Sequence, residues 1–270
     1  MPELPEVETT RRGLAPYVVG RTITRVEVRE PRLRWPVARG LPRALAARSI
    51  GSLERRAKYL LFGTDAGTLL VHLGMSGSLR YLAEPLDPAA HDHIDVHFEG
   101  GGALRFNDPR RFGSFILTPK PAAHPLLKDL GPEPLGDDFD ADYLWRSSRN
   151  RRVAIKQHLM NGHVVVGVGN IYASEALFRA GIHPQRIAGR IARPRFEPLV
   201  SSVRDVLRDA IEEGGTTLRN FVGGDGKPGY FRGSLRVYDR DGAPCLNCGT
   251  PIERRVLGQR ATFYCPRCQR

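Results

Sequence analysis

The sequence predicts an α+β protein of several domains: a β-rich N-terminal domain that starts with a helix, a helical C-terminal domain, and a metal-bound hairpin at the end. Three observations predict this class. Short runs of alternating apolar and polar residues fill positions 22–117, runs with helical periodicity follow residue 140, and all four cysteines lie in the last 26 residues. A chain of 270 residues has room for two domains or one large one.

The chain begins MPELPEVETTRRGL, and a helix is predicted within residues 1–15. Pro5 suits the first turn of a helix, and Glu6 and Glu8 suit the positive end of its dipole. The same argument does not explain Pro2 and Glu3, which precede the helix. Removal of Met1 makes Pro2 a terminal secondary amine with a carboxyl group beside it, so a chemical role is the alternative.

The runs TITRVEV, KYLLF, TLLVHLGM, IDVHF and ALRF indicate strands of a sandwich or barrel. Residues 119–140 contain five prolines and are predicted to be a linker. Helices are predicted in ADYLWRSSRNRRVAIKQHLM, IYASEALFRAGI and RFEPLVSSVRDVLRDAIEEGG, the last of which ends on a glycine pair suited to a C-cap. IERRV and ATFYC are predicted as the two strands of the terminal hairpin.

The four cysteines form two pairs, Cys245 with Cys248 and Cys265 with Cys268, each with two intervening residues. This spacing is typical of a zinc ribbon, in which the metal stabilises a segment too short to have its own core. Two disulfides are the alternative, which a reducing compartment disfavours. Four cysteine ligands leave no open coordination position, so the predicted zinc is structural.

The net charge of +12 favours a polyanionic partner, nucleic acid before membrane. No apolar run reaches the roughly 18 residues of a membrane span, and the acidic, proline-containing start differs from a secretory signal, so we expect a cytoplasmic protein. Arginines crowd the cysteine hairpin, where a guanidinium suits phosphate oxygens, and Arg260 at the tip is the preferred contact; a solvated basic tail is the alternative.

Three other stretches are candidates for binding. VVVGVGNIYASEALF has a glycine turn before a helix, so Asn170 either binds a phosphate or only starts the helix. Residues 214–233 hold seven glycines and form either a covering loop or a connector. HLGMSGS with Met75, and NDPRRFG with Arg110 and Phe112, could fill the gap left when a base leaves a duplex, although each alone suits an ordinary turn.

Together, PELPEVE, RRAKYLL, HLGMSGSLR, NDPRRFG, LGPEPL, VVGVGNIYASEALF, GGTTL, DGKPGYF and the cysteine pairs resemble bacterial formamidopyrimidine-DNA glycosylase, in unbroken order from residue 2 to the end. The resemblance implies a β-sandwich domain over residues 1–133 with the linker, a helix-two-turn-helix domain with a lesion-capping loop over 134–236, and a zinc finger over 237–270. The implied partner is double-stranded DNA with oxidised purines, and a monomer suits the chemistry.

The resemblance also implies roles for single residues. Pro2 matches the nucleophile, Glu3 the proton donor, and Glu6 a position that supports the terminus. Lys58 and Arg260 match the residues assigned to β- and δ-elimination. The void-filling triad corresponds to Met75, Arg110 and Phe112, and DNA contacts are expected at His91, Arg110, Arg151, Lys156 and Asn170.

Two alternatives remain. The related endonuclease VIII shares the fold, the terminal proline and the zinc finger but excises oxidised pyrimidines; the complete void-filling set and the PELPEV opening favour the purine enzyme. A non-catalytic zinc-containing DNA-binding protein would not require Pro2, Glu3 and Lys58. Because a peptide bond to Met1 removes the nucleophilic lone pair of Pro2, we expect the active species to lack Met1.

Overall fold

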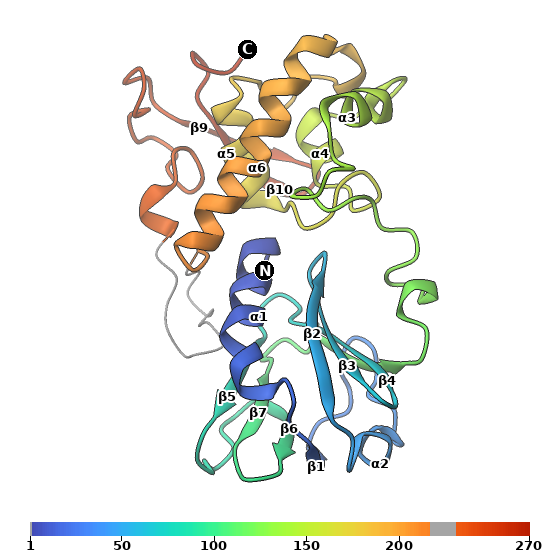
Figure 1. Cartoon of the computed structure of the whole chain (residues 1–270). Helices are drawn as coiled ribbons and strands as arrows, with labels where there is room; N and C mark the ends of the chain where they lie inside the picture. Colours follow the sequence, from blue (N-terminus) through green and yellow to red (C-terminus); the bar gives the residue numbers. More distant parts are fainter. Residues whose placement is uncertain (1, 217–230) are drawn as a thin grey trace. The chain divides into compact units, whose positions relative to one another are not determined.

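The structure is a computed structural model that describes residues 2–216 and 231–270 (Figure 1). Met1 lies outside the described residues, as do Phe221 and Tyr230 of the predicted covering loop. The chain divides into two compact units: an N-terminal unit of Met1–Lys128 with Glu213–Arg232, and a C-terminal unit of Asp129–Glu212 with Gly233–Arg270. This division leaves the three predicted domain boundaries untested.

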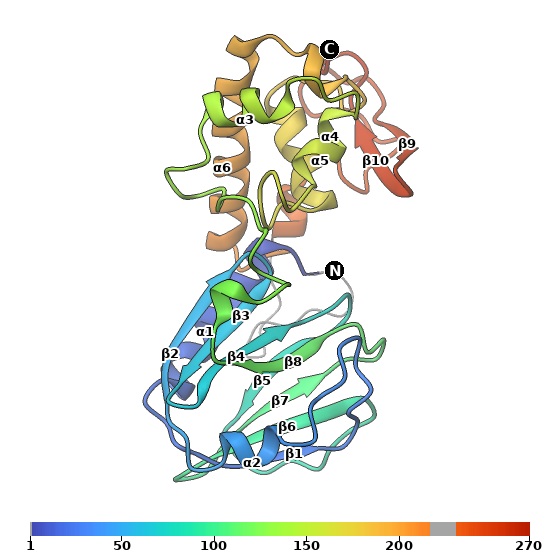
Figure 2. The same cartoon turned by 90° about the vertical axis from the view of Figure 1, so that its right-hand side faces the viewer.

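The N-terminal unit is a sandwich of two four-stranded antiparallel sheets, in the orders β1-β6-β7-β5 and β2-β3-β4-β8 (Figure 2). Apolar side chains from both sheets and from the first helix meet in one core that includes Leu14, Phe62 and Phe106. The predicted sandwich and its leading helix are therefore confirmed. The elements are α1 (Leu4–Val18), β1 (Ile23–Val28), α2 (Leu41–Leu45), β2 (Ile50–Arg56), β3 (Tyr59–Thr64), β4 (Gly67–His72), β5 (Ser78–Leu82), β6 (Asp92–Phe98), β7 (Ala103–Asn107), β8 (Ser114–Thr118) and the 3-10 helix η1 (Pro121–Ala123).

Three connections cross from one sheet to the other, and two of them, β4–β5 and β7–β8, run beside each other. Strand β4 pairs with β8, and β5 pairs with β7. The β4–β5 turn at residues 73–77 and the β7–β8 turn at residues 108–113 therefore begin and end on paired strands. These turns carry Met75, Arg110 and Phe112, which are separated in sequence but share one end of the sandwich.

The C-terminal unit combines helices with a two-stranded hairpin. Its elements are α3 (Ala141–Ser148), α4 (Ile155–Leu159), α5 (Asn170–Arg179), η2 (Ala188–Arg190), η3 (Arg193–Arg195), α6 (Phe196–Glu212), β9 (Glu253–Leu257) and β10 (Arg260–Tyr264), whereas η4 (Phe231–Ser234) begins in the N-terminal unit. Helix α5 packs against both α6 and β10. The predicted terminal hairpin is confirmed.

The stretch 141–160, which sequence periodicity marks as helical throughout, is two helices instead of one. Helix α3 ends at Ser148; the backbone of Arg149 is extended, and Asn150 follows with a left-handed φ of 60°. The Arg149 guanidinium folds back onto the Trp145 carbonyl at 3.1 Å and the Ser148 hydroxyl at 2.7 Å. These contacts end the helix where apolar periodicity alone gives no signal. None of the helices within residues 2–216 and 231–270 is long and apolar enough to cross a membrane.

Candidate active site and zinc centre

The N-terminal end of α1 is buried and held by a carboxylate. Glu3 and Glu6 are 3% and 2% exposed. The Glu3 backbone N–H donates to Glu6 Oε2 at 2.8 Å, and the Thr216 backbone N–H donates to Glu6 Oε1 at 2.8 Å, across 210 positions of sequence. Glu6 therefore uses both oxygens to fix the backbone that follows Pro2 to the start of the glycine-rich segment.

Two contacts show how α1 lies along β2. Arg11 donates to the Leu53 carbonyl at 3.4 Å, and Glu8 pairs with Arg55 at 3.2 Å. The earlier helix residue, Glu8, contacts the later strand residue, Arg55, so α1 and β2 run antiparallel. Continuing this register brings the Pro2–Glu3 end of α1 level with the β2–β3 turn, which carries Lys58.

Strand pairing places the turns that carry the void-filling residues at the same end of the sheet as Lys58. Tyr59 pairs with His72, and His72 pairs with Ser114 on the next strand. Lys58 precedes Tyr59 directly, and the β7–β8 turn ends immediately before Ser114. Within the N-terminal unit, the structure thus brings Pro2, Lys58 and the void-filling turns to one end of the β2-β3-β4-β8 sheet, whereas Arg260 belongs to the C-terminal unit.

His72 lies at this end of the sheet, although the sequence analysis did not identify it as a candidate site residue. Burial, with the positive charges of Lys58 and Arg34 adding to it, lowers the pKa of His72 to about 4, so the ring is neutral at pH 7. Its Nδ1 accepts the Gly74 N–H at 3.0 Å, which leaves Nε2 as the protonated nitrogen and a donor. The sequence feature that could have indicated a functional role for His72 is its place at the start of the HLGMSGS motif.

Arg110 and Phe112 are exposed on the β7–β8 turn. The Arg110 guanidinium stacks over the Phe112 ring at 4.8 Å from the ring centre, and Phe112 keeps 40% of its surface exposed. A large exposed aromatic ring with a guanidinium on its face presents an apolar wedge and a forked donor together. Met75, half-buried, lies on the neighbouring turn.

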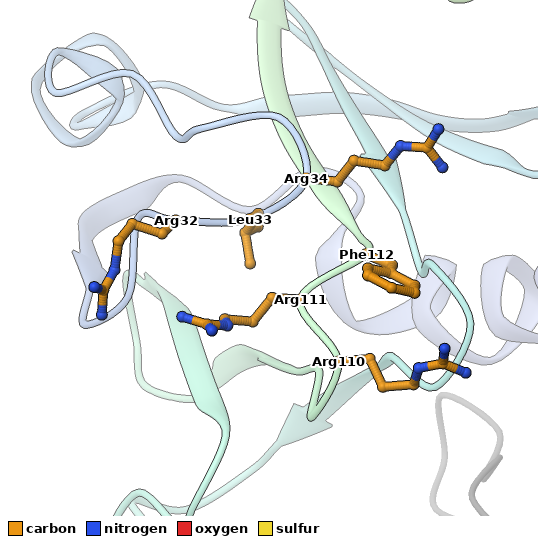
Figure 3. A pocket seen from close by; sticks show the side chains of 6 residues that line it. All are labelled: Arg32, Leu33, Arg34, Arg110, Arg111 and Phe112. Atoms are coloured by element: carbon orange, nitrogen blue, oxygen red, sulfur yellow. The ribbon is translucent and has the colours of Figure 1, made fainter.

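A cavity of about 520 Å³ opens beside this wedge and is lined by Arg32, Leu33, Arg34, Arg110, Arg111 and Phe112 (Figure 3). The guanidinium groups of Arg32 and Arg111 pair with Glu30 at 2.6 and 3.3 Å. In Figure 3, Arg34 and Arg110 extend on the opposite side, with Phe112 between them. Four arginines around an apolar floor form a surface suited to a polyanion that carries aromatic bases.

His91 directly precedes β6; it is exposed and has a left-handed φ of 71°. Its carbonyl accepts the Asp108 N–H at 3.0 Å, so it lies beside the β7–β8 turn.

Three residues of β1 and β6 resemble a metal site by their spacing: ligand atoms of Glu27, Asp95 and His97 lie within 4.8 Å of one another. Arg29 and Arg105 pair with Asp95 at 2.9 and 2.7 Å, so this group is an ion-pair network.

In the C-terminal unit, Asn170 is the first residue of α5. Its Nδ2 donates to the Ala261 carbonyl of the cysteine hairpin at 3.0 Å, and its Oδ1 is buried without a hydrogen-bond partner among the described residues. Helix N-termini carry unpaired N–H groups and a partial positive charge. Asn170 therefore links an anion-attracting helix end to the hairpin strand that begins at Arg260.

Lys156 is 1% exposed. Its ammonium donates to Thr262 Oγ1 at 2.9 Å and to the Ala261 carbonyl at 3.2 Å. The DNA contact expected of Lys156 stays a prediction, and these bonds favour a different contribution: fixing the hairpin to α4. Arg260 and Arg151 are both exposed, in positions open to a ligand.

The four cysteines converge on one point. Ligand atoms of Cys245, Cys248, Cys265 and Cys268 lie within 4.8 Å of one another, with Sγ–Sγ distances of 3.9 Å for Cys245–Cys268 and 3.5 Å for Cys248–Cys265. Sulfurs at about 2.3 Å from a tetrahedral zinc are about 3.8 Å apart, whereas a disulfide is about 2.0 Å long. The geometry fits one zinc ion with four thiolate ligands, as the spacing predicts.

Family models match nearly the whole chain: the formamidopyrimidine-DNA glycosylase N-terminal domain over residues 1–115, its H2TH domain over 130–222, and a zinc finger found in FPG and IleRS over 242–270. The chain is 60% identical to the formamidopyrimidine-DNA glycosylase of Thioalkalivibrio sulfidiphilus and 58% identical to that of Stutzerimonas stutzeri, over all of both chains in each case.

Solved structures of FPG proteins also resemble this chain over its full length. The MutM (FPG) protein of Thermus thermophilus superimposes with a TM-score of 0.89 at 41% identity, covering 99% of this chain and 98% of that one. A Lactococcus lactis FPG mutant in complex with Fapy-dG-containing DNA gives 0.92 at 34% identity, covering 100% of both chains. The full-length identity and the match of all three regions show that this chain belongs to the formamidopyrimidine-DNA glycosylase family.

Proposed function

We propose that the chain is a bifunctional DNA glycosylase and AP lyase of base-excision repair, which removes 8-oxoguanine and formamidopyrimidines from duplex DNA. The observation that carries the proposal is the alignment of the buried Pro2–Glu3 end of α1 with the Lys58 turn, in a chain that matches this family from end to end. Membership of the family supports the glycosylase activity, and the placement of these residues supports the lyase chemistry.

The reaction begins when the Pro2 amine attacks C1′ of the damaged nucleotide and the bond to the base breaks. Glu3, as a carboxylic acid, donates a proton to the sugar ring oxygen, which opens the ring and leaves an iminium between Pro2 and C1′. A secondary amine can form only this cationic imine, which is a strong electron sink. An unperturbed terminal amine titrates at about pH 8, so an appreciable fraction is unprotonated near neutrality.

The iminium acidifies the C2′ proton, so the 3′ phosphate leaves by β-elimination and the 5′ phosphate by δ-elimination. Lys58 is assigned to the first elimination and Arg260 to the second. The product is a one-nucleotide gap with a phosphate at each side. His72 contributes a neutral Nε2–H donor beside Lys58, suited to a phosphate oxygen.

Met75, Arg110 and Phe112 fill the gap left by the everted nucleotide, and Arg110 faces the orphaned base. His91, Arg151 and Asn170 contact the DNA, and Lys156 holds the hairpin that carries Arg260. The zinc ion supplies no chemistry; its four thiolate ligands fix the hairpin fold. The protein acts as a monomer in the bacterial cytoplasm.

A gel assay of base excision tests the function. The purified protein should convert a duplex with 8-oxoguanine opposite cytosine into phosphate-flanked gap products faster than a duplex with an oxidised pyrimidine. Glu3→Gln removes the proton donor and should slow excision by about 100-fold or more, whereas Glu54→Gln, an exposed carboxylate on β2, should match the wild type. Preference for the pyrimidine would support the endonuclease VIII activity, and duplex binding without any product would support the non-catalytic alternative.

A further inference from the structure

Asp108 lies at the centre of a hydrogen-bond network at the start of the β7–β8 turn. The residue has 0% exposure. Its Oδ2 accepts the Gly113 N–H at 2.8 Å, and its Oδ1 accepts the Ser76 hydroxyl at 3.2 Å and the Arg110 N–H at 3.3 Å. One carboxylate therefore accepts from two residues of its own turn and from one residue of the β4–β5 turn.

The main chain of Asp108 is held as well. Its N–H donates to the His91 carbonyl at 3.0 Å, and its carbonyl contacts His93 Nε2 at 2.8 Å. The side chain and the backbone of Asp108 thus connect to three separate segments of the sandwich. Because both its side chain and its backbone are hydrogen-bonded, Asp108 is fixed relative to the turns that it joins.

The two turns also pack backbone against backbone. Gly74 has a φ of 67°, and a Cβ added there would lie 2.6 Å from both Gly113 N and the Phe112 carbonyl carbon. A Cβ on Gly113 would lie 2.7 Å from the His72 carbonyl oxygen. The two turns thus approach closely at Gly74 and Gly113, where no Cβ fits, and the Asp108 carboxylate and the Ser76 hydroxyl form a polar link between them.

The residues that flank these bonds are those assigned to void filling. Ser76 follows Met75 directly, Arg110 is itself a donor to the carboxylate, and Gly113 follows Phe112. We infer that Asp108 is a positioning residue that holds Met75, Arg110 and Phe112 in register, so that all three enter the vacated space of the duplex together. This inference rests on the proposed function.

Asparagine at position 108 keeps the shape of the side chain but not its acceptors. An amide offers one acceptor oxygen, and its NH₂ group would face either Gly113 N–H or the Ser76 and Arg110 donors. The Ser76 hydroxyl can accept from that NH₂ group, but the backbone N–H groups of Gly113 and Arg110 can only donate, so the β7–β8 turn must lose one of these two bonds. The charge and the second oxygen of Asp108, more than its volume, therefore hold the β7–β8 turn in place beside Ser76.

The test compares two substrates in borohydride trapping. A duplex with 8-oxoguanine opposite cytosine requires the void to be filled, whereas single-stranded DNA with a preformed abasic site requires only the amine chemistry. Asp108→Asn should trap the duplex about 100-fold more slowly, the scale expected for misplaced groups, and should trap the single strand at the wild-type rate. A wild-type protein that traps neither substrate would refute the proposed function itself.

A fluorescence readout isolates insertion from chemistry. With 2-aminopurine next to the base opposite a stable abasic analogue, wild-type protein should increase the fluorescence by unstacking the probe, and Asp108→Asn should lose most of this increase at saturating protein. An unchanged increase, or equal slowing of both trapping reactions, would overturn the inference.

Two further variants keep the test decisive if Asp108→Asn does not fold. Ser76→Ala breaks only the link to the Met75 turn and should trap the duplex at a rate between those of the wild type and Asp108→Asn; a wild-type rate and fluorescence response would overturn the link. Asp95→Asn is the matched control, since Asp95 is 1% exposed in the same sandwich but pairs with Arg29 and Arg105. It should lower stability without changing the ratio of the two trapping rates.

Discussion

Replacing Glu6 with glutamine should weaken the N-terminal unit and slow Schiff-base formation together. Each carboxylate oxygen accepts one backbone N–H at 2.8 Å, from Glu3 and from Thr216, and the side chain is buried. An amide can accept only one of these bonds, and a buried N–H left without a partner costs about 1–3 kcal/mol. We expect the free energy of unfolding to fall by about 2 kcal/mol.

Urea titration followed by Trp35 fluorescence, in a Trp145→Phe background, measures this loss within the N-terminal unit. The trapping rate on a preformed abasic site reports on Pro2, since the released N–H belongs to the residue after it, and should fall about 10- to 100-fold. The exposed Glu54→Gln variant controls for the loss of charge and should stay within about 0.5 kcal/mol of wild type. Glu6→Gln with the stability and the trapping rate of the wild type would refute this reasoning.

Three more predictions concern the C-terminal unit. Zinc chelation should unfold the cysteine hairpin in circular dichroism and abolish duplex binding, with both restored by added zinc, because the metal provides folding free energy there; binding that survives complete chelation would contradict this. Burial, with the charge of Arg151 adding to it, lowers the pKa of His158 to about 4, so below about pH 6.5 the unfolded chain takes up a proton first and stability falls as the pH drops. Urea titrations should show about 2 kcal/mol of this loss by pH 4.5 in the wild type and not in His158→Gln; equal losses would contradict the assignment. Glu175 accepts the backbone N–H groups of Arg236, Val237 and Tyr238 at 2.8–2.9 Å, so Glu175→Gln should cost about 1–3 kcal/mol in urea titration, and an unchanged midpoint would count against these bonds.

Local patterns were enough to predict the architecture. Alternation identified the sandwich strands, and the spacing within each cysteine pair predicted the zinc centre, because these signals depend on residues close together in the sequence. The division of residues 141–160 into two helices was missed, since the bonds of the Arg149 guanidinium to Trp145 and Ser148 leave no mark in apolar periodicity.

The candidate site was predictable only in part. Pro2 and Lys58 followed from the family resemblance, but the roles of Asp108 and His72 depend on strand pairing that joins residues distant in sequence. The bond between Glu6 and Thr216 spans 210 positions, beyond the reach of any local pattern. The DNA contact that the resemblance implies for Lys156 stays a prediction, and its burial beside Thr262 could not be read from the sequence.

The most direct test of the central claim is to locate the covalent bond. Protein lacking Met1 is incubated with a duplex carrying 8-oxoguanine opposite cytosine, reduced with borohydride, digested, and mapped by peptide mass. The account predicts one adduct, on the amine of Pro2, in the peptide that begins PELPEVETTR. An adduct on another residue, or none from zinc-loaded protein that binds the duplex, would contradict it, as would full activity in protein whose intact mass retains Met1.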